Sequence, residues 1–269
     1  MRNLVWAVLA VAGLGLAAAQ SLEFGGWLGS PPASLGPTLH LAYPSGDWRF
    51  DVYMRALWPR TDETNLGLGV TRAFEAGPAG RAELGIRGHM GLDTQYWIEG
   101  RAAFALARAA LDLRVGYTLN RRPSHFWPFE RDSLGPYLDA DARFRLAKRL
   151  LLLGGYRFEN QASRGELALS WIQGGRTFTA GAGAYREATR AYAVLGFRTP
   201  VAGAVATGTV RIGSVDEFRL DYADPAYKAH LLLAYPPRAV AGVRWDAWGL
   251  DVGVDAQGFE LFLRYRVGL

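Results

Sequence analysis

The chain has 269 residues, of which half are apolar and 13% are aromatic, with 33 glycines, 13 prolines and no cysteine. A chain without cysteine has no disulfides, thiolate metal sites or cysteine-linked lipid anchor, and this apolar content excludes a disordered chain. The net charge of +5 is spread along the sequence without a basic run, which argues against nucleic-acid binding. All basic residues except Lys148 and Lys228 are arginines.

The amino terminus has the pattern of a secretory signal peptide. Arg2 precedes an apolar stretch at residues 4–16, and the small residues 17–19 follow as a cleavage site. The apolar stretch is shorter than the roughly 20 residues that a membrane-spanning helix needs. The alternative is an amino-terminal helix buried in the fold. We expect residues 1–19 to be removed on export and residues 20–269 to form one domain.

From residue 22 onward, apolar and polar residues alternate. Residues 48–58 place Trp48 and Trp58 on an apolar face, with Arg49 and Asp51 on the opposite face. Because successive side chains of a strand point to opposite faces, such runs predict amphipathic strands. Glycine and proline turns separate the runs, so we expect an all-β chain with an even number of strands, about 14–18. The alanine-rich residues 102–113 could form a helix. However, the large apolar residues change from even-numbered to odd-numbered positions within this stretch, which favours two strands.

Two features favour a membrane barrel over a soluble secreted β protein, which remains the alternative. Trp48 and Trp58 lie about 33 Å apart along an extended strand, which projects to roughly 25 Å in a tilted strand. That height matches the apolar band between the two aromatic girdles of a barrel. The polar face is rich in arginine, which enclosed faces favour because it pairs with carboxylates. The alternative explanation is a GC-rich genome, in which arginine codons replace lysine codons. A chain without helices spans a membrane only as a closed barrel.

Taken together, the sequence resembles the bacterial outer-membrane β-barrel proteins of porin type. The last run begins at Phe259 and ends on Leu269, and it resembles the carboxy-terminal assembly signal of that class. It departs from the class in ending on leucine, where an aromatic residue is common. The resemblance implies a closed antiparallel transmembrane β-barrel in the outer membrane of a two-membrane bacterium. Its partners would be the lipid bilayer and, through the last strand, the outer-membrane assembly machinery.

Residues that could support catalysis or metal binding are sparse. The four histidines lie far apart and form no metal-binding motif, so we expect neither a metal nor a cofactor. Asp139 and Asp141 share one face and could serve a membrane-embedded hydrolase. Arg143 and Arg145 continue that face, however, and favour an internal ladder of ion pairs.

The longest predicted connection, residues 120–133, falls between the seventh and eighth predicted strands and should face outward. It combines cations and aromatics, namely Arg121, Arg122, Phe126, Trp127 and Phe129. Such a loop could stack on sugar rings or contact lipid head groups. We favour the simpler interpretation, a loop that folds over the barrel mouth or rests at the membrane interface, because tryptophan and tyrosine concentrate at interfaces.

Alternation also predicts which charged residues line the lumen. The predicted lumen-lining residues are Arg49, Asp51, Arg55, Arg81, Glu83, Arg87, Glu99, Arg101, Asp112, Arg114, Asp139, Asp141, Arg143, Arg145, Glu260, Arg264 and Arg266. Arginines outnumber carboxylates in this set, and a basic surplus in a wet lumen favours anions. Full pairing could instead close the lumen, and the strand number decides between the two.

We therefore expect a passive diffusion channel for small polar or weakly anionic solutes, and not an enzyme. The alternatives are a non-conducting structural or adhesive barrel and, less favoured, the hydrolase at Asp139 and Asp141.

Overall fold

A computed structural model describes most of the chain after residue 20. The described ranges are 21–30, 34–55, 65–75, 80–91, 96–118, 135–159, 162–186, 190–213, 216–235, 237–255 and 258–268. The predicted signal peptide at residues 1–19 lies outside them. Within these ranges the secondary structure consists of 18 β-strands.

The strands follow one another in chain order. They are β1 (Ser21–Ser30), β2 (Ser34–Ser45), β3 (Trp48–Arg55), β4 (Asn65–Glu75), β5 (Arg81–Gly91), β6 (Tyr96–Ala105), β7 (Ala109–Thr118), β8 (Gly135–Ala147), β9 (Leu150–Glu159), β10 (Ala162–Gln173), β11 (Arg176–Tyr185), β12 (Arg190–Val201), β13 (Ala204–Gly213), β14 (Asp216–Ala223), β15 (Tyr227–Tyr235), β16 (Arg238–Trp245), β17 (Trp248–Asp255) and β18 (Gly258–Gly268).

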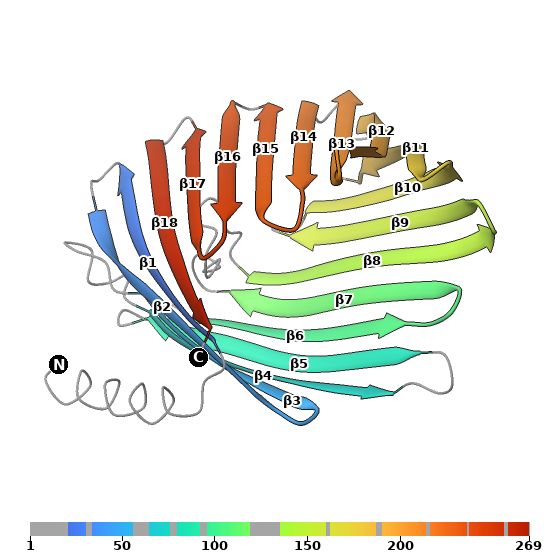
Figure 1. Cartoon of the computed structure of the whole chain (residues 1–269). Helices are drawn as coiled ribbons and strands as arrows, with labels where there is room; N and C mark the ends of the chain where they lie inside the picture. The colour runs from blue at the N-terminus through green and yellow to red at the C-terminus, as the bar shows by residue number, and fades with distance from the viewer. Residues whose placement is uncertain are drawn as a thin grey trace, which may run out of the picture.

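Every strand pairs antiparallel with its neighbours in the chain, and the first strand pairs with the last. The β1–β18 ladder runs from Ser21 opposite Gly268 to Ser30 opposite Phe259, so the ring of pairings closes (Figure 1). Closure leaves no edge strand whose backbone groups lack a partner. The predicted all-β fold with an even strand number is confirmed, at the upper end of the expected range. The two strands predicted in the alanine-rich stretch are β6 and β7.

The outward face of the barrel is apolar. Leu68, Ile86 and Leu167 lie at outward positions of β4, β5 and β10 and are 58%, 52% and 60% exposed. Apolar side chains exposed to this extent on every part of a closed barrel are suited to lipid contact and not to water. Among the described residues, no helix is long and apolar enough to cross a membrane.

The turns after the even-numbered strands contain two to five residues and lie at one end of the barrel, here called the short-turn rim. The turn at Gly174 and Gly175 has φ values of 56° and 79°, a left-handed conformation that glycine adopts without strain. β7 ends and β8 begins at the opposite rim, and residues 119–134 between them are not described. The predicted loop residues Arg121, Arg122, Phe126, Trp127 and Phe129 lie outside the described residues.

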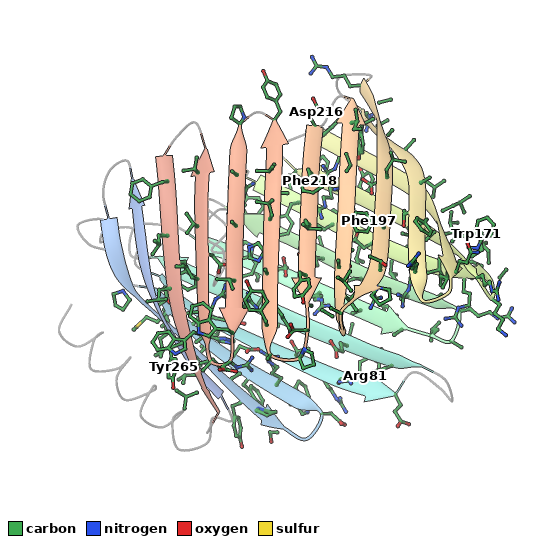
Figure 2. All side chains as sticks on the ribbon, turned by 45° about the horizontal axis from the view of Figure 1, so that its top comes forward. Arg81, Trp171, Phe197, Asp216, Phe218 and Tyr265 are labelled. Carbon is green, nitrogen blue, oxygen red and sulfur yellow. The ribbon has the colours of Figure 1, made fainter. Side chains whose placement is uncertain are left out.

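Exposed aromatic side chains follow the short-turn rim on the outward face. They include Tyr43, Trp48, Phe144, Trp171, Phe178, Tyr227, Trp245, Trp248 and Tyr265, of which Trp171 and Tyr265 are labelled in Figure 2. Tryptophan and tyrosine at one height of a barrel form the girdle that lies at a membrane interface. Trp48 is one of these exposed residues, whereas Trp58 lies outside the described residues.

Candidate functional site: the inner face of the barrel

Strand register determines which side chains face the lumen. The predicted lumen-lining residues whose side chains the structure describes occupy inward positions of β3, β5, β6, β7, β8 and β18, in register with one another on neighbouring strands. For Arg55 and Glu260 the strand position is described, but the side chain is not.

Ion pairs on β3–β7 join residues of the same or the adjacent strand. The closest N–O distances are 2.7 Å between Arg87 and Glu99 and 2.6 Å between Arg101 and Asp112. On β3, Arg49 lies 3.0 Å from Asp51, whose carboxylate also contacts His40 of β2 at 2.8 Å. Because these contacts run along the wall, they neutralise charge without crossing the lumen.

A buried chain of hydrogen bonds fastens β6 to β8. The Trp97 indole Nε1 donates to the Tyr137 hydroxyl at 2.7 Å, and that hydroxyl donates to Glu99 at 2.8 Å. All three side chains are at most 3% exposed. The Tyr137 ring lies over Gly116, its cross-strand neighbour on β7, where an added Cβ would overlap the hydroxyl. A glycine opposite the tyrosine therefore lets the ring lie flat against the wall.

Replacing Gly116 with valine is expected to displace the Tyr137 ring and lower barrel stability by about 1–3 kcal/mol, as overpacking does. Urea unfolding in lipid vesicles measures the change. Gly154→Val on β9 is the matched control, because an added Cβ at Gly154 has nothing within 4 Å. Equal losses in the two variants would contradict this account of Gly116.

A second network joins residues of four strands between β10 and β14. Arg211 of β13 lies 2.9 Å from Glu166 of β10 and also pairs with Glu217 of β14. The Tyr192 hydroxyl donates to Glu166 at 3.3 Å, and its ring lies over Gly183, its cross-strand partner on β11. The same pairing of tyrosine with glycine thus recurs, and it leaves the path between β10 and β13 clear for the ion pair.

A third polar cluster lies on β15–β18. Asp251 is fully buried, pairs with Arg264, and lies 3.5 Å from the His230 Nε2 atom. Gly242, between His230 and Asp251, leaves room for both side chains, because an added Cβ would overlap them. The Arg264 guanidinium also lies 5.2 Å above the Phe262 ring. Such a buried arginine and carboxylate depend on each other to balance their charge.

Asp139 and Asp141, considered above for hydrolysis, lie on the inward face of β8. Asp139 is in register with Arg114 on β7 and Arg157 on β9, whereas Asp141 faces Asp112 and Gly155. An arginine on each side of Asp139 fits the predicted ladder of charges. Among the residues that the structure describes, there is no group of three or more histidines and carboxylates that could hold a metal ion.

Several inward residues on β10–β17 are absent from the predicted lumen-lining residues. The main ones are Glu166, Tyr192, Arg211, Glu217, Arg219, Asp221, His230 and Asp251. Their strands are short or carry glycine and alanine at alternate positions, which weakens the contrast between the two faces. The spacing of Glu166, Ala168 and Ser170 against Leu167, Leu169 and Trp171 was the signal that could have found β10.

Space remains inside the barrel beside these networks. Three cavities of about 590, 490 and 500 Å³ lie against the inner face. The first extends from Arg81 on β5 to Glu166 on β10, and the third lies among Arg49, Arg87 and Arg114. An 18-stranded barrel is wide enough to leave an aqueous lumen when its wall residues pair along the wall.

No family model matches the sequence, and no curated protein is similar to it. Similar solved structures include OccK2 of Pseudomonas aeruginosa, with 9% identity, a TM-score of 0.51, and coverage of 93% of this chain and 97% of OccK2. OccK10 of the same bacterium has 10% identity, a TM-score of 0.49 and coverage of 93% and 99%. A triple mutant of the Rhodopseudomonas blastica porin has 9% identity, a TM-score of 0.47 and coverage of 92% and 98%. The OccK2 superposition supports a β-barrel fold of the same kind for this chain.

Proposed function

We propose that the protein is a passive diffusion channel of a bacterial outer membrane for small polar solutes, with a preference for weakly anionic ones. The observation that carries the proposal is the arrangement of the inner face. Eighteen strands close into a ring, and the described ion pairs join residues along the wall. Water and small solutes can then pass beside the charged wall.

Two further observations support the membrane location. The outward face is apolar, and an aromatic girdle follows the short-turn rim. β18 pairs with β1 to close the barrel, which is the position expected of a terminal strand recognised by the assembly machinery.

Planar-bilayer recording of the purified, folded protein tests the proposal. We expect stepwise ion conductance. Across a KCl gradient we expect a reversal potential shifted toward the chloride equilibrium potential, because arginines outnumber carboxylates among the predicted lumen-lining residues. Folding is checked by the shift in gel migration on heating. A protein whose gel migration shifts on heating but that gives no current would overturn the proposal. A reversal potential shifted toward the potassium equilibrium potential would overturn the anion preference.

A further inference from the structure

One part of the inner wall differs from the ion-paired strands. A cavity of about 490 Å³ lies near the short-turn rim, with Arg143 and Arg145 of β8 on one side and Arg198 of β12 on the other. Between the arginines lies a floor that includes Leu151, Leu153, Ala168, Val194, Ser170 and Thr179. The ion pair of Glu166 with Arg211 also borders this space, and its charges neutralise each other. We call this space the amphipathic cavity.

The arginines of the amphipathic cavity differ from those elsewhere in their pairing. Arg101 is held 2.6 Å from Asp112 on the wall of β6 and β7. Arg143, Arg145 and Arg198 have no ion pair with a carboxylate in the part of the chain that the structure describes. An arginine that the wall does not neutralise keeps its charge and its five N–H donors for a solute.

A fourth arginine belongs to the same group. Arg108 lies in the turn between β6 and β7 and lines the amphipathic cavity. Its carbonyl oxygen accepts a hydrogen bond of 2.7 Å from the Arg145 backbone N–H, which fixes this turn beside β8. Arg108 likewise has no ion pair among the described residues. The cation cluster therefore sits on backbone held in place by hydrogen bonds.

The floor of the cavity is unusual for a channel lumen, where inward residues are polar. Leu151 lies opposite Arg145 and Leu153 lies opposite Arg143 in the β8–β9 register, so each leucine has an arginine at its side. Ala168 and Val194 are 5% and 3% exposed, so the apolar surface that a solute can cover is that of the partly exposed Leu151 and Leu153. An apolar surface that faces the lumen gains free energy when an apolar group covers it.

Hydroxyl groups extend the polar side of the cavity. Thr177 and Thr207 flank Arg198 in the register of β11, β12 and β13, and both line the cavity. Hydroxyls beside an arginine can donate to the same oxyanion, which adds direction to the charge attraction. The volume is within the range of sites that hold small organic molecules.

We infer that the amphipathic cavity is a binding subsite for small organic carboxylates that carry an apolar body, such as an arene or a short alkyl chain. The carboxylate pairs with the unneutralised arginines, and the apolar body lies on the leucine floor. This inference rests on the proposed channel function, and it adds a class of solute that inorganic anions do not represent.

Current block in planar bilayers tests the subsite with three probes. 3-Phenylpropanoate carries both groups, acetate carries only the charge, and 3-phenylpropanamide carries only the ring. We expect 3-phenylpropanoate to block the KCl current with an apparent affinity at least about tenfold tighter than either of the others, since burying a phenyl group or pairing a carboxylate each adds at least that factor. Equal block by all three probes, or none, would overturn the inference.

Variants separate the two halves of the subsite. Leu151→Ser with Leu153→Ser should remove the advantage of 3-phenylpropanoate over acetate, and Arg143→Gln with Arg198→Gln should remove its advantage over the amide. Leu232→Ser on β15 and Arg266→Gln on β18 are controls at inward positions outside the cavity. Loss of discrimination in the controls as well would assign the effect to the whole lumen and overturn the subsite.

Calorimetric titration of the folded protein in nanodiscs distinguishes this inference from the proposed function. Tight binding of 3-phenylpropanoate by a barrel that carries no current would support the subsite and overturn the channel. A conducting barrel that neither binds nor is blocked by 3-phenylpropanoate would overturn the subsite and leave the channel standing.

Discussion

Replacing Asp251 with alanine is expected to destabilise the barrel by about 3–5 kcal/mol, one of the two largest effects expected of a single substitution here. The carboxylate is fully buried and balances the charge of Arg264, whose side chain is only 7% exposed. Without Asp251, the guanidinium stays buried on β18 and loses its partner on β17, and His230 loses a neighbour at 3.5 Å. Urea unfolding in vesicles, followed by tryptophan fluorescence, measures the loss.

Two comparisons make this prediction specific. Asp221→Ala breaks the pair with Arg219 on β14, where the two side chains are 37% and 59% exposed, and should cost at most about 1 kcal/mol. Adding Arg264→Leu to Asp251→Ala should restore part of the stability, because it removes the unbalanced charge. Equal losses for Asp221→Ala and Asp251→Ala would show that the burial of the pair has no energetic consequence.

The sequence predicts the architecture well because two solvents act on every strand. Lipid on one side and water on the other impose a period of two, so runs such as Trp48 to Met54 show an apolar face and a polar face directly. The change of the apolar residues from even-numbered to odd-numbered positions between Phe104 and Leu111 likewise marks the turn between β6 and β7. These signals are local, and they require no knowledge of which strands pair.

The inner face is less predictable because its contacts depend on register across several strands. Glu166 and Arg211 are 45 residues apart, and they meet because Gly183 opposite Tyr192 leaves the wall between them flat. No spacing in the sequence connects them. The amphipathic cavity was missed for a related reason: Leu151 and Leu153 face inward within a run of four leucines, where alternation is absent.

The run Leu231–Leu233 on β15 poses the same problem, and the structure resolves it. Leu231 faces outward near the middle of the strand, whereas Leu232 faces inward opposite Arg219 and Val240. We expect Leu231→Arg to destabilise the barrel by about 2–4 kcal/mol, the cost of an arginine facing lipid at the bilayer midplane. Leu232→Arg should cost little, since its side chain enters the wet lumen.

The two variants control each other, because they place the same residue at adjacent positions of one strand and differ only in the face that carries it. Urea unfolding in vesicles gives the free energies, and bilayer recording adds an independent measure: Leu232→Arg should shift the reversal potential further toward chloride, while Leu231→Arg should leave it unchanged. The opposite order of stabilities would mean that β15 is turned by one residue relative to its neighbours. In that register His230 would face lipid instead of Asp251, and the polar cluster on β15–β18 could not exist.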